Sequence, residues 1–326
     1  MVRAKITGTG SAIPAKVLSN FDLEGMVDTS DEWIRTRTGI RERHIAAEGE
    51  YTSTLATRAA EQALALAGIE ATDLDMIVVA TVTPDFPFPA TACIVQANLG
   101  ACNATAFDLS AACSGFIYGL SIVDKFIRTG TVKRALVIGA EVLSRVVDWT
   151  DRNTCLLFGD GSGAVVVEAV EGTSGILDSI IRSDGSYWEL LYQPGIGSRN
   201  PASMQAVQDR KMYLQMQGNE VFKLAVRAME DVALKVLSDN GLTPSDVGLL
   251  IPHQANRRIV DAIVKRLNLP DEKVFINLDR YGNTSAASIP IALDEANRQG
   301  RIKTGDLVLL DAFGGGLTWG AMAVRW

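Results

Sequence analysis

The segment FDLSAACSGFIYGLSIVDKFIRTG (107–130) and the segment NLDRYGNTSAASIPIALDEANRQG (277–300) align with each other over their whole length. Two further pairs align in the same order. The segment FGDGSGAVVV (158–167) aligns with FGGGLTWGAMAV (313–324), and the helix-like stretch TLATRAAEQALALAG (54–68) aligns with part of the helix-like stretch 220–241. In the first alignment Cys113 stands opposite Asn283. The shared order predicts a duplicated fold, although α/β units also resemble one another without a duplication.

Strand-like segments connect these repeated pieces. They are rich in Val, Ile and Leu without polar alternation, which is typical of strands covered on both faces. Six segments have this character: MIVVATV (76–82), RALVIGA (134–140), AVVVEAV (164–170), VGLLIP (247–252), DLVLLDA (306–312) and AMAVRW (321–326). Helix-like stretches such as 54–68 and 220–241 lie between them, so we predict an α/β fold of two similar halves, residues 1–175 and 176–326.

The composition restricts the possible functions. The chain has 326 residues and a net charge of -7, which argues against a nucleic-acid binder, because such a protein needs a basic surface. No apolar run reaches the ~20 residues of a membrane helix, and the N-terminal MVRAKITGTGSAIP lacks the apolar core of a signal peptide. We therefore expect a cytoplasmic protein without a membrane partner. The four cysteines have no CxxC spacing, so no disulfide framework or metal site is predicted.

Cys113 is the candidate nucleophile. In DLSAACSGF (108–116) a strand-like start is followed by small residues and then by a helix-like stretch, which predicts a strand–turn–helix elbow. The positive end of a helix dipole favours a thiolate, so we expect the pKa of this thiol to be lowered. The alternative is a buried structural cysteine, which is our interpretation of Cys93, Cys102 and Cys155.

Two other side chains are suited to act on a carbonyl group. His253 follows a predicted buried strand, where ligand sites of such sheets lie, and its Nε2 could donate to a carbonyl oxygen or exchange a proton. Asn283, in a Gly-Asn turn, could add a second donor, and FGGG (313–316) offers the unobstructed backbone N–H groups that an oxyanion hole requires. The alternatives are a structural histidine, which is how we interpret His44, a turn asparagine and a tight connection between strands.

Taken together, these segments resemble the β-ketoacyl-acyl-carrier-protein synthase III family, the initiating condensing enzymes of bacterial-type fatty acid synthesis. The resemblance implies the thiolase fold, in which two similar halves form a five-layered αβαβα core, and a homodimer. The motifs that carry it span nearly the whole chain: SDEWIRTRTGIRERHIA (30–46), DLSAACSGF (108–116), FGDGSGA (158–164), GNEVFK (218–223), PHQANRRI (252–259), YGNTSAASIP (281–290) and FGGGLTWGA (313–321).

The resemblance also implies a decarboxylative condensation. Cys113 would attack an acyl-CoA thioester, releasing coenzyme A, while the N–H groups of Cys113 and Gly315 hold the oxyanion. His253 and Asn283 would then hold the thioester carbonyl of malonyl-acyl-carrier protein as it loses carbon dioxide. The enolate carbon would attack the acyl-cysteine to give 3-oxoacyl-acyl-carrier protein. Coenzyme A thioesters are substrates in this scheme, and no cofactor is expected.

Further family positions would contact these substrates. Trp33 and Arg152 would sandwich the adenine of coenzyme A, a stacking role for which Arg is better suited than Lys. The other positions for coenzyme A and the substrate tunnel are Arg37, Thr38, Gly218, Asn256 and Phe313. After His253, the basic residues Arg258, Lys265 and Arg266 resemble the patch that docks an acidic carrier protein, unless they form an ordinary solvated helix face.

Two features concern the acyl primer, whose length and branching the sequence leaves open. Phe88 matches a position that often reaches across the dimer and closes the partner's acyl pocket. The segment SYWELLYQPGIGSRNPASMQAVQDRKMYLQMQ (186–217) is longer than its equivalent in typical acetyl-primed members, and we expect it to shape the primer pocket or the tunnel mouth.

Three classes of rival function remain. Polyketide-type and alkylquinolone-type synthases share the Cys-His-Asn set, although PHQANRRI (252–259) and the short chain favour the fatty-acid enzyme. A degradative thiolase would carry a second catalytic cysteine in a CxG-type motif, where this chain has FGGG (313–316). A non-enzymatic binding protein on the same fold is disfavoured because all three reactive residues are present.

Overall fold

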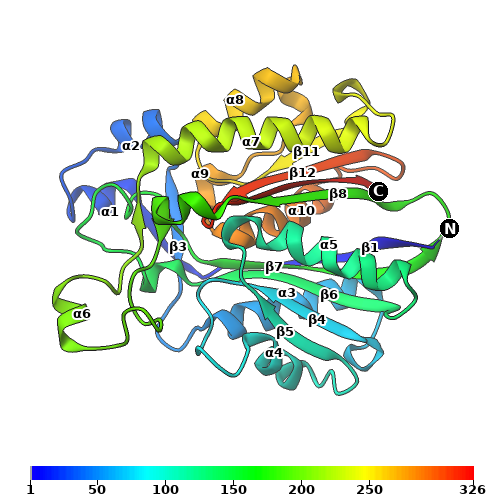
Figure 1. Ribbon diagram of the computed structural model, residues 1–326, viewed down its shortest axis with the longest axis horizontal. Coiled ribbons are helices and arrows are strands. Elements are labelled where there is room, and N and C mark those ends of the chain that lie inside the picture. The colour runs from blue at the N-terminus through cyan, green and yellow to red at the C-terminus, as the bar shows by residue number, and fades with distance from the viewer. Residues whose placement is uncertain (1) are drawn as a thin grey trace.

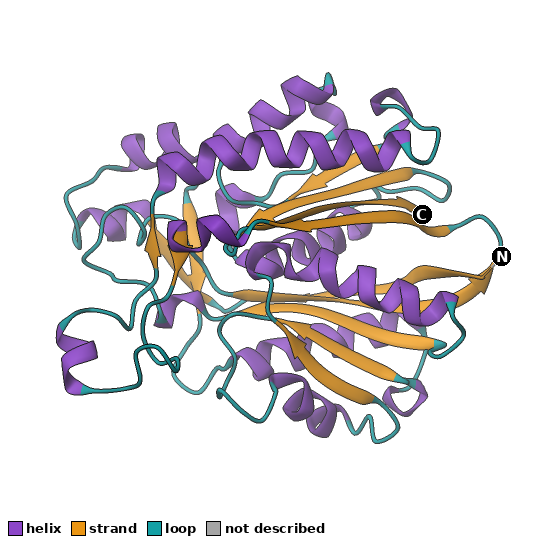
Figure 2. Cartoon of the chain, in the orientation of Figure 1, coloured by secondary structure: helices purple, strands orange, loops and turns teal. Residues whose placement is uncertain are grey.

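The computed structural model describes residues 2–326, which form two β-sheets stacked with helices between and outside them (Figures 1 and 2). The first sheet has five strands in the order β1-β7-β6-β4-β5, which are Val2–Ala12, Gly161–Glu171, Arg134–Glu141, Met76–Ala80 and Thr105–Leu109. The second has four strands in the order β11-β12-β13-β8, which are Leu249–Pro252, Leu307–Gly314, Thr318–Arg325 and Gly175–Ser183.

Both sheets have one topology. In the first, β4 pairs in parallel with β5 and β6, while β6 pairs antiparallel with β7, which pairs antiparallel with β1. In the second, β11 pairs in parallel with β12, and the antiparallel pairs β12–β13 and β13–β8 follow. An isolated parallel bridge from Leu250 to Val274 stands where β5 stands in the first sheet. The expected duplication is therefore present in the order and directions of the strands.

Helices complete five layers. Helices α5 (Gly115–Arg128) and α10 (Ser288–Arg298) fill the space between the sheets, where their apolar side chains contact both. Helices α3 (Thr52–Ala67) and α4 (Thr91–Leu99) cover the outer face of the first sheet, and α7 (Gly218–Ser238) with α8 (Arg257–Leu267) covers that of the second (Figure 1). This order is the predicted αβαβα core.

The apolar strands are buried on both faces, as their lack of alternation predicts. In β4, Val78 faces the central helices, whereas Ile77 and Val79 face α3 and α4. All six predicted strands are present. The edge strand β8 was not among them, because polar residues such as Asp178 and Ser179 interrupt its apolar run.

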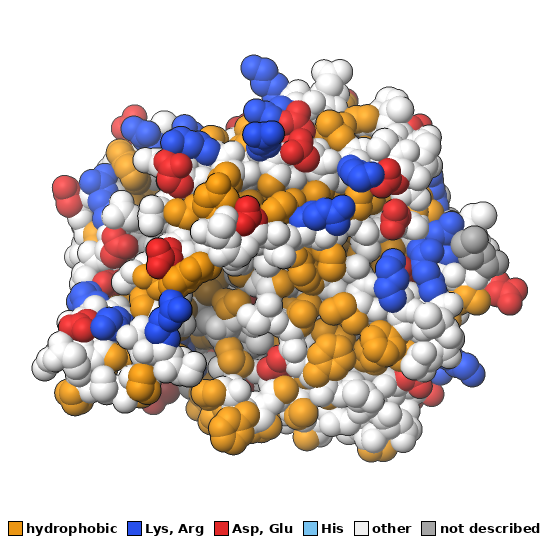
Figure 3. Space-filling view, in the orientation of Figure 1, with side chains coloured by type: hydrophobic (Ala, Val, Ile, Leu, Met, Phe, Trp, Pro, Cys, Tyr) orange, Lys and Arg blue, Asp and Glu red, His pale blue; other side chains and the backbone are white. Residues whose placement is uncertain are grey.

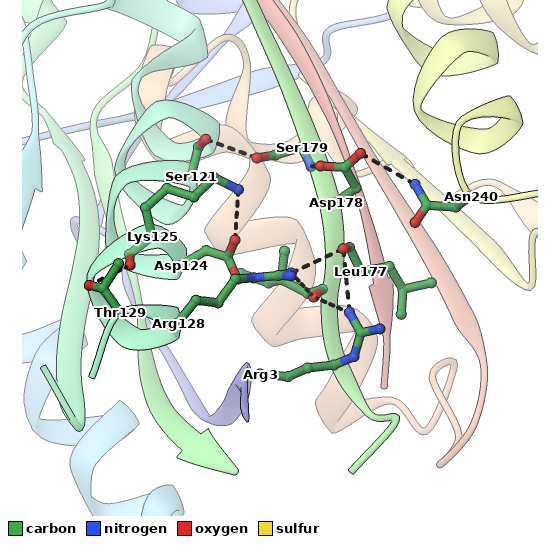
Figure 4. A network of polar contacts seen from close by, with 11 residues as sticks. Arg3, Ser121, Asp124, Lys125, Arg128, Thr129, Leu177, Asp178, Ser179 and Asn240 are labelled. Carbon is green, nitrogen blue, oxygen red and sulfur yellow. Dashed lines mark hydrogen bonds and ion pairs between the residues drawn. The ribbon is translucent and has the colours of Figure 1, made fainter. Parts of the chain in front are cut away.

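Polar contacts fasten α5 of the first half to β8 of the second (Figure 4). Arg128 Nη2 donates to the carbonyl oxygens of Ile176 and Leu177 at 2.7 and 3.0 Å, and Arg3 also donates to that of Ile176. Arg128 Nε pairs at 2.7 Å with Asp124, whose carboxylate is fully buried. Charge-assisted bonds of this kind fix α5 along β8, and hence the two halves against each other.

Shorter elements gather at the end of the sheets drawn on the left of Figure 1. Two tight turns, η2 (Ala112–Ser114) and η7 (Ser285–Ala287), lead into α5 and α10.

Within residues 2–326, no helix has both the length and the apolar character needed to cross a membrane. The remaining elements are β2 (Lys16–Ser19), α1 (Asn20–Glu24), α2 (Asp31–Thr38), β3 (Glu42–Ile45), η1 (Ala71–Asp73), η3 (Leu143–Arg145), η4 (Gly185–Leu190), β9 (Leu191–Tyr192), α6 (Met204–Gln208), β10 (Gln215–Met216), η5 (Pro244–Asp246), η6 (Asp271–Lys273) and α9 (Leu278–Tyr281).

Candidate active site

Cys113 lies in the turn η2 between β5 and α5, so the predicted elbow is confirmed. Ala112, the first residue of the turn, has a φ of 45°, in the left-handed region that residues other than glycine rarely adopt. This sharp turn places Cys113 just before the first turn of α5. Its side chain is nearly buried, at 7% exposure.

The FGGG segment packs directly against this turn. A β-carbon at Gly314 would lie 2.6 Å from the Cys113 nitrogen, so only glycine fits there without displacing the nucleophile. A β-carbon at Gly315 would lie 2.9 Å from the Leu191 carbonyl oxygen and 3.7 Å from the β-carbon of Ala112, so Gly315 also lies close to this turn. The structure therefore brings together Cys113 and Gly315, the two residues predicted to form an oxyanion hole.

Two cavities meet at Cys113. The first, which we call the Trp33 cavity, has a volume of about 350 Å³, and the second, the Val82 cavity, about 330 Å³. Cys113, Phe158 and Leu191 line both. The Trp33 cavity also contains most of the predicted site residues, namely Arg37, Thr38, Gly218, His253, Asn256, Arg258, Asn283 and Phe313. Gly315 lines the Val82 cavity.

His253 lies directly after β11 and is held through both backbone and ring. Its N–H donates to the carbonyl oxygen of Asp311 at 2.7 Å, and its Nδ1 lies 2.6 Å from Ser288 Oγ at the start of α10. Burial lowers the pKa of His253 to about 3, so the ring is neutral at physiological pH. Donation from the Ser288 hydroxyl to Nδ1 would put the ring proton on Nε2, the tautomer that can donate to a carbonyl oxygen.

Asn283 is fixed by three contacts. Its N–H donates to the Leu157 carbonyl at 2.8 Å, and its own carbonyl accepts from Gly159 N–H at 3.0 Å. Its side-chain Oδ1 accepts from Ser285 N–H at 2.9 Å. Because a backbone N–H can only donate, this bond identifies the oxygen of the amide and leaves the Nδ2 group as the donor for a ligand.

The electrostatics of the thiol differ from the expectation. Burial raises the pKa of Cys113 to about 12, so the resting site holds a thiol and not a thiolate. The N-terminus of α5 acts in the opposite direction, but the loss of hydration around a nearly buried sulfur is the larger effect. The prediction of a lowered pKa was therefore wrong.

Trp33 and Arg152, the residues predicted to sandwich adenine, lie against each other. The Arg152 guanidinium lies 4.3 Å from the centre of the Trp33 ring, and that of Arg37 lies 5.8 Å away. A guanidinium at this distance already occupies the face on which a base would stack. Trp33 and Arg152 are thus brought together as predicted, with no gap between them.

The basic residues of α8 are partly neutralised by their neighbours. Arg266 is ion-paired with Glu230 of α7, and Arg257 pairs with Asp261 at 2.6 Å. The Arg258 guanidinium lies 5.3 Å from the Phe222 ring, at the wall of the Trp33 cavity. Lys265 is exposed on the same helix.

The segment 186–217 borders both cavities. Leu191 lines the two, Met216 lines the Trp33 cavity, and Leu214 lines the Val82 cavity. Figure 3 shows a hollow in the surface beside α6, with hydrophobic side chains on its rim. Phe88, the other residue that concerns the primer, is 85% exposed.

Sequence reasoning missed three residues around the reactive groups. Ser288 contacts His253, Ser285 contacts Asn283, and Glu141 is a fully buried acid at the end of β6. Glu141 had a signal in the sequence, since it is a charged residue immediately after the apolar run RALVIGA (134–140). The two serines had none, because Ser is common in small-residue turns.

Comparisons with known proteins show to which family the chain belongs. The family profile of 3-oxoacyl-[acyl-carrier-protein] synthase III matches residues 107–185, and the profile of its C-terminal part matches residues 237–326. A curated "Beta-ketoacyl-[acyl-carrier-protein] synthase III" of Caldanaerobacter subterraneus subsp. tengcongensis is 58% identical over 100% of this chain and 98% of its own. The chain belongs to the 3-oxoacyl-[acyl-carrier-protein] synthase III family.

Solved synthase III structures have the same fold. The crystal structure of the Aquifex aeolicus VF5 enzyme has a TM-score of 0.93 at 54% identity, covering 99% of this chain and 100% of that one. The priming β-ketosynthase of the R1128 polyketide pathway has a TM-score of 0.92 but only 35% identity, covering 99% and 96%. The predicted synthase III function and thiolase fold are therefore confirmed, and the polyketide-type alternative is not favoured.

Proposed function

We propose that this synthase III transfers an acyl group from coenzyme A to Cys113 and condenses it with malonyl-acyl-carrier protein. The observation that carries the proposal is the position of the Cys113 thiol at the junction of two cavities. One cavity contains two neutral donors, His253 and Asn283, and the other is bounded mainly by apolar or small residues. A thioester entering by the first cavity can deliver its acyl chain to the second.

In the first half-reaction, Cys113 attacks the thioester carbon and coenzyme A departs as the C–S bond breaks. The close approach of Gly314 to the Cys113 nitrogen brings the following residue, Gly315, beside the nucleophile. The N–H groups of Cys113 and Gly315 are our candidates for the two donors to the oxyanion. Donors held by tight backbone packing need no rearrangement when the charge develops.

In the second half-reaction, His253 and Asn283 hold the carbonyl oxygen of the malonyl thioester. Burial keeps His253 neutral, and Asn283 has its oxygen occupied by Ser285, so both present N–H donors. Two uncharged donors stabilise an enolate oxygen, whose charge is present mainly in the transition state, more than they stabilise the substrate. Loss of carbon dioxide is thereby favoured over simple binding.

Coenzyme A binding requires the Trp33–Arg152 contact to open. The 4.3 Å separation leaves no space for a base between the two groups. Arg152 must therefore rotate away and return on the other face of the adenine. Thr38, Asn256 and Phe313, which line the same cavity, would border the pantetheine arm, together with Gly218 and Arg37.

The carrier protein would dock on α8. Arg258 lies at the cavity wall and Lys265 is exposed, so both are available to an acidic partner, whereas Arg266 is paired with Glu230. Positive charge at the mouth of the site steers an acidic protein that carries the substrate on a flexible arm.

A homodimer in the cytoplasm is the proposed form of the enzyme. Two aromatic residues of one loop, Phe86 and Phe88, are 55% and 85% exposed, as expected of side chains that a second copy covers. All four cysteines are free thiols, which suits a reducing compartment. Phe88 would then reach the acyl cavity of the partner.

Incubation with radiolabelled acyl-CoA tests the function. Wild-type protein should carry label on Cys113 and release 3-oxoacyl-acyl-carrier protein when malonyl-acyl-carrier protein is added. Cys113→Ala should do neither, while Cys93→Ala, an exposed thiol, should do both. Retention of label by Cys113→Ala would show that Cys113 is not the nucleophile. Efficient condensation with malonyl-CoA in place of the carrier protein would favour a polyketide-type enzyme.

A further inference from the structure

The first half-reaction needs a group that accepts the proton of Cys113. The thiol has a pKa of about 12, so it begins the reaction protonated. His253 shares the cavity, but its pKa of about 3 makes it a weak base. A second acceptor must therefore lie within reach of the sulfur.

Glu141 is a carboxylate buried beside this site. Its side chain is fully inaccessible, and it accepts from Thr83 Oγ1 at 2.5 Å, from Val82 N–H at 3.1 Å and from Thr81 Oγ1 at 3.2 Å. None of these groups is a cation. Burying an acid without a positive partner penalises its charged form, and groups placed in this way cluster at functional sites.

Ser285 lies near both Glu141 and the nucleophile. It lines the Val82 cavity together with Cys113, and η7, the turn that it begins, packs against β6, the strand that ends at Glu141. Its side chain lowers the pKa of both the Cys113 thiol and the Glu141 carboxylate. Ser285 has a φ of 49°, in the strained left-handed region, and its backbone N–H is fixed by Asn283 Oδ1. Strain at a non-glycine residue next to a nucleophile is typical of positions that a reaction requires.

A glycine in β6 allows this approach. A β-carbon at Gly139 would collide with the carbonyl oxygen of Ala286, so the backbone of the turn η7 rests directly on the strand that ends at Glu141. The same turn packs against η2, which carries Cys113. The close contact places Ser285 over the acid and beside the sulfur.

We propose that Glu141 accepts the proton of Cys113 through the hydroxyl of Ser285 during acyl transfer. This inference rests on the proposed function of Cys113. As the Sγ–C bond forms, the thiol proton moves to Ser285 Oγ and the Ser285 proton moves to the Glu141 carboxylate. When the bond between the acyl carbon and the coenzyme A sulfur breaks, the proton returns by the same hydroxyl to that sulfur. Glu141 and Ser285 end the step unchanged.

The electrostatics suit this transfer. Burial raises the pKa of Glu141 to about 7, against the lowering effect of its hydrogen bonds, so part of the population is ionised at neutral pH and is a far stronger base than His253. Cys113 is the titratable group that faces Glu141 from η2. Asp160, the residue before the neighbouring strand β7, directs its carboxylate instead to Ser144 and to Ala46 N–H.

The decisive variant is Glu141→Gln, which keeps the shape and removes the base. The rate of acyl-enzyme formation is measured in single turnovers between about pH 5.5 and 9. Wild-type protein should gain rate as the pH rises through about 7, the pKa of Glu141. Glu141→Gln should lose that inflection and ~10²–10⁴ in rate at pH 8. Ser285→Ala should lose rate similarly, although its backbone N–H can still hold Asn283.

Thr83→Val separates proton transfer from packing. It removes the 2.5 Å bond to the carboxylate while leaving the base in place. Because that bond stabilises the charged form, its loss should raise the pKa of Glu141 and move the inflection of the rate profile to higher pH. Asp160→Asn, a change of another buried acid, is the matched control and should keep the wild-type profile.

The outcomes are distinguishable from a failure of the proposed function. If Cys113→Ala is still labelled, the function is wrong. If Cys113 is the nucleophile but Glu141→Gln keeps the wild-type rate and inflection, the proton transfer is wrong. An equal loss of rate at every pH, with the inflection retained, would also overturn it, because that result marks a packing role. Should Glu141→Gln fail to fold, an unshifted profile in Thr83→Val would have the same meaning.

Discussion

The turns η2 and η7 have one backbone form and different tasks. Each begins with a residue of positive φ, Ala112 at 45° and Ser285 at 49°, and each leads into a helix of the central layer. The position that matches Cys113 in this register is Ala286, three residues after Asn283. The sequence alignment that set Cys113 opposite Asn283 was therefore displaced, because the second turn is approached by a longer connection.

The difference between the turns shows how a duplicated fold can divide one reaction. The first turn supplies the sulfur that forms and breaks bonds. The second supplies no nucleophile, but its Ser285 holds Asn283 and lines the Val82 cavity together with Cys113. The strained backbone was retained in both halves, while the side chains came to serve a single centre.

The largest expected effect is in variants that lose one half-reaction, malonyl decarboxylation, and keep the other, acyl transfer. His253→Ala and Asn283→Ala should still form acyl-enzyme, but each should lose ~10²–10³ in the rate of malonyl-carrier-protein decarboxylation, the usual effect of one missing oxyanion donor. Both steps are measured with labelled substrates. His44→Gln, at the other histidine, should leave both steps intact. Equal losses in the two steps would show that the halves do not divide the chemistry in this way.

Gly139 tests whether the turns must touch the first sheet closely. Gly139→Ala adds a methyl group against the Ala286 carbonyl oxygen and should lower the free energy of unfolding by about 1–3 kcal/mol, as overpacking commonly does. Thermal and denaturant unfolding measure this. At Gly185 a β-carbon would meet nothing within 4 Å, so Gly185→Ala should change stability by less than about 0.5 kcal/mol. Comparable stability of the two variants would mean that the close approach is not required.

Ser288 tests a smaller contribution of the second half. Ser288→Ala removes the 2.6 Å contact to His253 Nδ1 and leaves the tautomer of the ring unspecified. We expect the decarboxylation rate to fall about three- to ten-fold, in keeping with the loss of one hydrogen bond, and acyl transfer to be unchanged. Ser121→Ala, at a serine that bonds Ser179 instead, serves as control. A loss confined to acyl transfer would contradict the assignment.

The smallest expected effect concerns the helices that follow equivalent strands. Helix α4 of the first half, TACIVQANL, has no charged residue, whereas α8 of the second has four basic ones. Arg258→Glu and Lys265→Glu should each lower kcat/KM for malonyl-acyl-carrier protein by about two- to five-fold at low salt. The loss should shrink as ionic strength rises, because salt screens the attraction.

Lys265 makes the docking test specific. Arg258 also lines the Trp33 cavity, so its reversal can disturb coenzyme A, whereas Lys265 is not among the residues that line that cavity. Lys265→Glu should therefore leave acyl transfer from acyl-CoA unchanged. Equal losses of kcat/KM for both substrates would indicate a damaged helix. If kcat/KM for the carrier protein does not fall, the basic residues of α8 form an ordinary solvated face and not a docking surface.

The fold and the three reactive residues could be predicted from the sequence. The repeated pattern predicts the order of strands, and strand ends of a layered sheet meet at one edge, which was enough to place Cys113 and His253 together. Asn283 was placed with them by an alignment that proved to be three residues out of register. The motifs around them indicated the family. These properties depend on local pattern and on order along the chain.

The properties that the sequence did not reveal depend on how deeply a side chain is buried and on contacts between segments far apart in the chain. The raised pKa of Cys113 follows from how completely other layers cover it, which no local motif records. The proposed link from Glu141 to Ser285 depends on the close approach of β6 and η7, which are far apart in the chain, at Gly139. The closed contact of Trp33 with Arg152 likewise joins distant segments.

The central helical layer that both sheets share has a consequence for how the duplicated protein arose. Helices α5 and α10 bury their apolar faces against each other's sheet, so a half-length chain would expose one face of its sheet to water. Such a chain could be stable only by pairing with something of complementary shape, and a second copy of itself presents that shape by symmetry. The ancestor before duplication would then have been an obligate pair, and the modern protein would hold that old subunit interface as its interior.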